Sequence, residues 1–332
     1  MHSAVALSTP TVPHFVPMRI SLGVGGAEID WIDVSAADFR LPFLRDRIAA
    51  ARRLGRAPER GPWPTPPPRQ IPPAGILFHS GRCGSTLVAR VLAEIECCHM
   101  VGEPEAINHV LGGVPGWAIA PDALRYDTLT RAIGALGQPS HSGQDRFVLK
   151  LSSWNAVHLQ RLDRVLPKLP KIYLYRAPEE ILVSMLDAPP GWAWRAADPL
   201  IAGLFLGEPP SVSGWGSLEF AARVLGRGLA AVADAAEQDR HGEWLLVAYD
   251  QLPDAIWGAI AAHLGITVPA GIMPRLRALA TVDAKDRSGV KRFERDGARK
   301  RSAVSPEILE LVERFAAASY RRLEQLRGGR GR

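Results

Sequence analysis

Short apolar runs and longer segments of helical periodicity organise the N-terminal part of this chain. Two partly alternating runs, 18–24 and 27–34, are separated by Gly25-Gly26, which predicts a β-hairpin. A helical pattern follows over 43–54. We therefore expect residues 1–57 to form a small appendage made of a hairpin and a helix.

A proline-rich connector separates this appendage from the rest of the chain. Eight of the sixteen residues in 58–73 are proline, a composition typical of an extended linker. From residue 74 onward apolar strands alternate with helical patterns, which is typical of a mostly parallel sheet covered by helices. We expect strands at 75–79, 146–151, 171–175 and 244–248, and helices at 85–94, 156–166, 179–186 and 218–235. The stretch 187–217 is rich in proline, glycine and tryptophan, which indicates an irregular loop region.

The composition argues against several classes of protein. Hydrophobic residues at 47% and charged residues at 22% are ordinary for a globular chain and unlike a disordered or fibrous one. No apolar run reaches the length of a membrane span and no signal-peptide pattern opens the chain, so we expect no stable membrane insertion. The three cysteines, Cys83, Cys97 and Cys98, suit neither a disulfide framework nor a zinc site. A cytoplasmic protein without a metal is the expectation.

The positive net charge is confined to the end of the chain. The net charge is +6, yet the last 48 residues hold fourteen Lys and Arg against seven Asp and Glu. The preceding part of the chain is therefore close to neutral. Because the basic residues do not spread over the whole domain, we expect no nucleic-acid partner. Residues 321–332 are interpreted as a frayed helix and a solvated basic tail.

The strongest chemical signal is an apolar strand, a glycine-containing turn and a helix within residues 75–90. Such a turn directs backbone N–H groups and the positive end of a helix at one point, where a phosphate or sulfate fits. The turn lacks the lysine of a Walker A loop, because the cation Arg82 precedes the second glycine. Taken alone, the motif is equally compatible with a turn that binds no ligand. The candidate loop consists of Gly81, Arg82, Cys83, Gly84, Ser85 and Thr86.

A second strand-to-helix junction carries another candidate for anion binding. Its strand ends in Arg176, and Ser184 follows eight residues later in the next helix. Arg176 is therefore expected at the carboxyl edge of the sheet, where open α/β sheets bind ligands. This second element strengthens the interpretation of the first turn as a ligand site.

Together these motifs resemble the superfamily of sulfotransferases that use 3′-phosphoadenosine-5′-phosphosulfate (PAPS). The family's [KR]-x-G-[ST]-T loop, which binds the 5′-phosphosulfate, matches residues 82–86. Its strand-terminal arginine and later serine, which bind the 3′-phosphate, match Arg176 and Ser184. Tyr249 lies in a segment similar to the family's [VR]-x-Y-E-x-L element, with Asp250 where glutamate is usual. The resemblance spans residues 74–265 and implies a three-layer P-loop nucleotide-binding fold.

The resemblance is nearest to the tyrosylprotein and bacterial branches, and it also implies catalytic residues. These branches carry a glutamate base shortly after the P-loop helix, and Glu103 and Glu105 occupy that place. Either carboxylate could take the proton of an acceptor hydroxyl. We prefer Glu103 and leave Glu105 open. Lys150, which ends a predicted strand, would neutralise charge near the transferring group, unless it is a solvated lysine at a strand end.

Two further segments have both a functional and an ordinary structural interpretation. The resemblance places a late loop over the 3′-phosphate, where Lys285, Arg287 and Lys291 occur, but a solvated basic stretch is equally compatible with the sequence. Trp192 and Trp194 either wall an acceptor pocket or pack an ordinary loop.

The implied function is sulfuryl transfer from PAPS to a hydroxyl-type acceptor, which is a small molecule, a carbohydrate or a peptide. The domain that carries it is expected at residues 74–320. The alternatives are an ATP-dependent P-loop phosphotransferase and a non-catalytic adenine-nucleotide-binding protein. The sequence leaves open the acceptor, the role of residues 1–57 and the oligomeric state.

Overall fold

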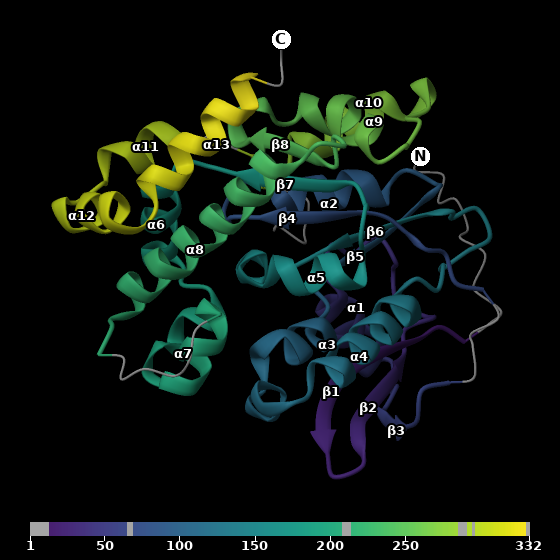
Figure 1. The fold of residues 1–332 in the computed structure, drawn as a ribbon. Helices are drawn as coiled ribbons and strands as arrows, with labels where there is room; N and C mark the ends of the chain where they lie inside the picture. The colour runs from purple at the N-terminus through teal and green to yellow at the C-terminus, as the bar shows by residue number, and fades with distance from the viewer. Residues whose placement is uncertain (1–12, 65–68, 208–213, 285–290, 294–295, 330–332) are drawn as a thin grey trace.

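A central parallel sheet organises the computed structural model (Figure 1). The structure describes residues 13–64, 69–207, 214–284, 291–293 and 296–329. The five strands, all parallel, follow the spatial order β5 (Cys98–Gly102), β6 (Arg146–Lys150), β4 (Pro73–His79), β7 (Lys171–Tyr175) and β8 (Trp244–Ala248). The mostly parallel sheet predicted from the sequence is confirmed, and β5 adds a strand that the pattern had not assigned.

Successive residues of the central strands enter two different hydrophobic cores. Phe78 of β4, Leu149 of β6 and Tyr173 of β7 belong to one core, whereas Leu77 and Val148 belong to the other. Because side chains alternate across a strand, the two cores lie on opposite faces of the sheet. Each face is therefore covered, which gives the expected three-layer α/β architecture.

The helices divide between these two faces. The core around Leu77 includes residues of α2 (Ser85–Ala93), η6 (Ile256–Ile260), α9 (Ala261–His263) and α10 (Met273–Ala280). The other core includes residues of α5 (Leu159–Val165), α6 (Pro178–Asp187), α7 (Pro199–Leu206), α8 (Ser217–Gln238), α12 (Pro306–Phe315) and α13 (Ala317–Gly329). In the part of the chain that the structure describes, no helix combines the length and apolarity needed to cross a membrane.

The N-terminal region forms a second, antiparallel sheet. Its three strands are β1 (Phe15–Gly23), β2 (Gly26–Asp33) and β3 (Glu59–Gly61), and α1 (Leu44–Arg53) follows the hairpin. The predicted hairpin and helix are confirmed, whereas β3 is a short strand inside the expected linker. Ile20 and Ile32 pack in the same core as Leu149 of the central sheet. Helices α3 (Glu105–Asn108) and α4 (Asp122–Leu136) contribute to that core as well.

Three local expectations were wrong in detail. The helix expected at 156–166 starts as the 3₁₀ helix η3 (Ser153–His158) before α5. The stretch expected to be an irregular loop contains the 3₁₀ helix η4 (Gly191–Ala197) and α7, whose first residue is a proline. The end of the chain, expected to be a frayed helix and a solvated tail, is helical as far as Gly329, but this helix packs along α8 (Figure 1), where Arg322 contacts Asp234 and Glu237 at 2.7 and 2.6 Å.

Candidate functional site

One cavity of about 2400 Å³ collects the residues that follow the carboxyl ends of the parallel strands. His79 ends β4, Glu103 follows β5, Ser152 follows β6, Arg176 follows β7 and Tyr249 follows β8, and all of them line this cavity. Ligands of open α/β sheets bind at this edge. The fold therefore places the sequence motifs around a single space.

The loop between β4 and α2 has the backbone of an anion cradle. Gly81, Arg82 and Gly84 have left-handed φ values of 82°, 52° and 80°. A Cβ on Gly84 would lie 2.5 Å from Leu252 Cδ1, so only glycine fits this turn without displacement. The turn leads directly into α2, whose first N–H groups have no acceptor within their own helix. These N–H groups and the positive helix end provide an anion site beside Ser85, Thr86 and the cavity.

The two side chains inside this turn have different roles. Cys83 is buried and its thiol donates to the Leu174 carbonyl over 3.3 Å. Burial raises the pKa of Cys83, so the thiol stays protonated and is no nucleophile. Arg82 is partly exposed, lines the cavity and donates to the Ala188 carbonyl. Arg82 is therefore the cation of the loop that a ligand can reach.

Glu103 is held by a cation and a histidine. Its Oε1 contacts Lys150 Nζ and lies 3.5 Å from His79 Nε2, and its own backbone has a left-handed φ of 49°. Burial alone would raise the pKa of Glu103, but the charge of Lys150 and the contact with His79 hold it well below its usual range. The carboxylate is therefore ionised at neutral pH, and the backbone strain at this residue is of the kind found at functional sites.

His79 connects this carboxylate to the cradle. The Gly81 N–H donates to His79 Nδ1 over 3.0 Å, so the ring proton lies on Nε2, which faces Glu103. Burial, followed by the charge of Lys150, lowers the pKa of His79, which keeps the imidazole neutral. No motif in the sequence had pointed to this histidine.

Lys150 and Glu105 differ sharply in exposure. Lys150 is completely buried, with Nζ against Glu103 and 4.9 Å from the centre of the Phe43 ring. The residues lining the cavity include Glu103 and Phe43 but not Lys150, so the ammonium lies behind the carboxylate. Glu105 is exposed at the start of α3 and lines the same cavity. Both carboxylates proposed as the base therefore face the cavity, and only Glu103 carries a buried counter-charge.

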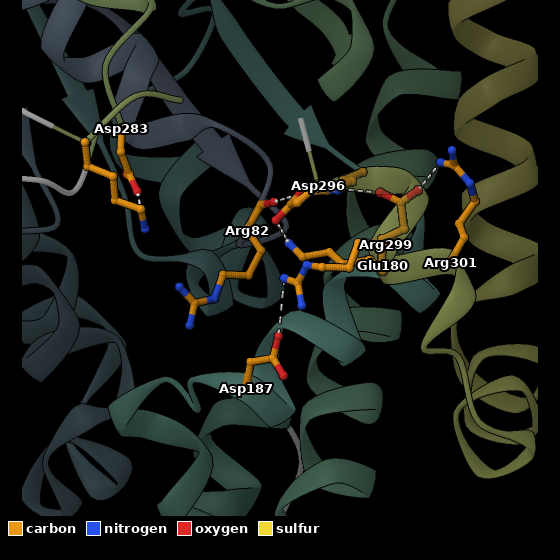
Figure 2. A network of polar contacts seen from close by, with 10 residues as sticks. Arg82, Glu180, Asp187, Asp283, Asp296, Arg299 and Arg301 are labelled. Carbon is orange, nitrogen blue, oxygen red and sulfur yellow. Dashed lines mark hydrogen bonds and ion pairs between the residues drawn. The ribbon is translucent and has the colours of Figure 1, made fainter. Parts of the chain in front are cut away.

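A cluster of opposite charges surrounds Arg176. Arg176 is 4% exposed, with Nε 2.6 Å from Glu180 and Nη2 2.8 Å from Asp296. The Tyr249 ring lies under its guanidinium at 4.2 Å from the ring centre. Asp296 also contacts the buried Lys300 at 2.7 Å. Figure 2 shows Asp296 and Glu180 inside this network, while the Arg82 side chain extends away from Asp296.

Asp296 lies between two buried cations of this cluster. Burial would raise the pKa of Asp296, but Lys300 and Arg176 together lower it. One carboxylate thus bridges two buried cations, as one phosphate could. Ser184, on α6, lines the cavity near this network.

Of the three late basic residues predicted near the 3′-phosphate, Lys291 lies in the part of the chain that the structure describes. Lys285 and Arg287 lie outside the described residues. Lys291 lines the cavity but is exposed and pairs with Asp283 at 3.1 Å, not with the Arg176 cluster. The basic residues that reach the cluster come instead from α11 (Gly297–Ser302), which lies just downstream. The signal was present in the sequence as the run Arg299, Lys300 and Arg301.

The two tryptophans of η4 take separate positions. Trp192 is half-buried, packs against Phe205 and Phe220, and lines the cavity. Trp194 is 67% exposed. Among the described residues no cluster of three His, Cys, Asp or Glu side chains could hold a metal ion.

Comparison with known proteins finds similarity among solved structures only. No family model and no curated protein matches the chain. The chain is similar to the sulfotransferase domain from the curacin biosynthetic pathway, with 14% identity and a TM-score of 0.44 over 74% of this chain and 98% of that chain. It is similar to a sulfotransferase from Alicyclobacillus acidocaldarius, with 14% identity and a TM-score of 0.44 over 78% and 96%. It is also similar to a sulfotransferase from Mycobacterium avium, with 15% identity and a TM-score of 0.46 over 75% and 78%.

Proposed function

We propose that this protein transfers a sulfuryl group from PAPS to a hydroxyl-type acceptor. One observation carries the proposal: the Gly81–Thr86 cradle, the Glu103 carboxylate and the buried Arg176 cluster all line one cavity. The motifs of residues 82–86 and of Arg176 with Ser184, which resemble those of sulfotransferases, support the same assignment.

The residues of the cavity fit a nucleotide with phosphate groups at two separate positions. Arg82 and the N–H groups of the cradle would hold the 5′-phosphosulfate. Arg176, Ser184 and Lys300 would hold the 3′-phosphate, and Tyr249 would contact a neighbouring part of the nucleotide. The fit at the 3′ position is supported by Asp296, whose carboxylate already bridges two buried cations there.

Glu103 is proposed as the general base. When bound, PAPS would supply the sulfuryl group: the acceptor oxygen forms a bond to sulfur as the bond between sulfur and the 5′-phosphate oxygen breaks, and 3′-phosphoadenosine-5′-phosphate leaves. Glu103 accepts the proton of the acceptor hydroxyl, and the neutral ring of His79 packs beside the carboxylate, with Nε2 3.5 Å from Oε1. Lys150 keeps the carboxylate ionised until the proton arrives, so its contribution passes through Glu103. Lys150 was expected to neutralise charge near the transferring group. We propose that it acts on Glu103 instead, because the ammonium lies behind this carboxylate and does not line the cavity.

Calorimetry with the product nucleotide tests the proposal. We expect 3′-phosphoadenosine-5′-phosphate (PAP) to bind at least tens-fold more tightly than AMP or ATP without magnesium, because charge-assisted contacts to the 3′-phosphate contribute on the order of 2–3 kcal/mol. Arg176→Ala should remove most of this preference. Arg322→Ala, which breaks surface ion pairs between α13 and α8, is the matched control and should leave it intact. Equal or tighter binding of ATP that depends on Mg²⁺ would overturn the proposal in favour of a phosphotransferase.

A further inference from the structure

The N-terminal appendage docks directly beside the proposed base. A Cβ on Gly102, the last residue of β5, would lie 1.9 Å from the Pro42 carbonyl oxygen and 3.5 Å from Phe43 Cα. Arg47, which is buried in α1, donates to the Met100 carbonyl of the same strand over 2.5 Å. The segment that precedes α1 is therefore packed against the strand that ends immediately before Glu103.

This docking places the ring of Phe43 over the buried ammonium of Lys150. The distance from Lys150 Nζ to the ring centre is 4.9 Å, within the range of cation–π attraction. The guanidinium of Arg45 lies over the same ring at 4.4 Å, and it is exposed. Phe43 thus separates a completely buried cation from one that faces solvent.

Phe43 also belongs to the wall of the cavity. Leu41, Pro42, Phe43 and Arg45 line the cavity together with Glu103, whereas Lys150 does not. The Phe43 ring and the Glu103 carboxylate, which both lie against the ammonium, thus both belong to the cavity wall. Removing the ring would admit water to Lys150 and allow the ammonium to leave Glu103.

We propose that Phe43 is a positioning residue, which holds Lys150 on Glu103. The positioning role rests on the proposed function, because it assumes that Glu103 and Lys150 serve sulfuryl transfer. The covering of Lys150 itself is independent of that reaction. The appendage lies outside residues 74–265, over which the sequence motifs extend, and this role gives it a function in the site.

Chemical labelling of Lys150 tests the covering without any assay of activity. Reductive methylation with formaldehyde and a borohydride, followed by mass spectrometry of the peptide with Lys150, reports access to the ammonium. We expect labelling at least about tenfold faster in Phe43→Ala than in the wild type, and unchanged labelling in Phe43→Tyr, which keeps the ring. Phe39→Ala is the matched control, because Phe39 precedes α1 as well but packs on His141 and does not line the cavity. Equal labelling of wild type and Phe43→Ala would overturn the proposal.

A kinetic measurement tests the positioning role. Transfer from radiolabelled PAPS to a panel of phenol, sugar and tyrosine-peptide hydroxyls should show kcat lowered roughly 10- to 100-fold in Phe43→Ala, with the KM for PAPS unchanged and Phe43→Tyr close to wild type. Phe43→Leu provides the same comparison if the alanine variant does not fold. Faster labelling with an unchanged kcat would overturn the positioning role alone. A wild type that transfers no sulfuryl group would overturn the proposed function, and the labelling would still decide whether Phe43 covers Lys150.

Discussion

Breaking the pair between Glu103 and Lys150 from one side should cost far more stability than removing both charges. Lys150 is 0% exposed, and its ammonium contacts the Glu103 carboxylate and the Phe43 ring. Glu103→Gln leaves this ammonium buried without a counter-charge, which typically costs about 3–5 kcal/mol. The double variant Glu103→Gln/Lys150→Met removes the charge and keeps an apolar chain of similar length, so most of the loss should be recovered.

Thermal unfolding gives this loss a measurable size. An unfolding entropy near 2.1 cal/mol/K per residue makes one kcal/mol correspond to about 1.4 °C in a chain of 332 residues. Glu103→Gln should therefore lower Tm by roughly 4–7 °C, and the double variant by clearly less. Glu105→Gln changes an exposed carboxylate two residues away and should leave Tm within about 1 °C.

Scanning calorimetry of these variants, combined with turnover, tests both the pair and the choice of base. If Glu103→Gln is as stable as the wild type, or if the double variant is the less stable of the two, the buried ion pair does not exist as described. For turnover we expect Glu103→Gln to lose about 10²-fold or more with PAP affinity nearly intact. Full activity in Glu103→Gln with an inactive Glu105→Gln would transfer the role of base to Glu105.

Three further predictions concern pH, the cradle and the anion cluster. The pKa of Glu103 is lowered in the folded protein, so the ionised carboxylate stabilises the fold fully above the ordinary carboxyl pKa, and this stabilisation is lost progressively as the pH falls below that value. Tm measured from pH 7 to 3 should therefore fall more steeply in the wild type than in Glu103→Gln, and parallel curves would contradict this. Gly84→Ala should lower stability by roughly 2 kcal/mol and abolish PAP binding, since φ is 80° and a Cβ would lie 2.5 Å from a leucine side chain. The control Gly25→Ala places its Cβ in open space and should change neither stability nor PAP binding. Normal PAP affinity in Gly84→Ala would show that the turn is no cradle. Asp296→Ala should strengthen PAP binding several-fold in calorimetry, because the carboxylate competes with the phosphate for two buried cations. Asp234→Ala, which breaks an exposed ion pair outside the cavity, should have no effect, and weaker binding in Asp296→Ala would show that Asp296 organises the site instead.

The central sheet could be predicted because its signals are local. Each of the four strands assigned from the sequence is a short apolar run, since helices cover both faces of a parallel sheet. The strand β5 was not assigned, because His99 interrupts its apolar run and the strand it pairs with lies more than forty residues away. The helix in the 187–217 stretch was missed because proline and glycine dominate the composition around it.

In the candidate site as well, some residues could be predicted from local motifs and others could not. The cradle and Arg176 with Ser184 could be found because each motif is contiguous or lies within one strand and the next helix. The ring of Phe43 over Lys150 and the pairing of Arg176 with Asp296 join residues more than a hundred positions apart. Such contacts depend on how the elements pack, and no local pattern in the sequence encodes them.

The most direct test of the proposed function is the transfer of radioactive sulfur. PAPS labelled in its sulfuryl group is incubated with the protein and a metabolite extract, and the products are separated and identified by mass spectrometry. A labelled sulfate ester should form with the wild type without added Mg²⁺, and at least about 10²-fold more slowly with Glu103→Gln. Transfer of the γ-phosphate from labelled ATP in the presence of Mg²⁺, with no labelled sulfate ester from PAPS, would contradict it.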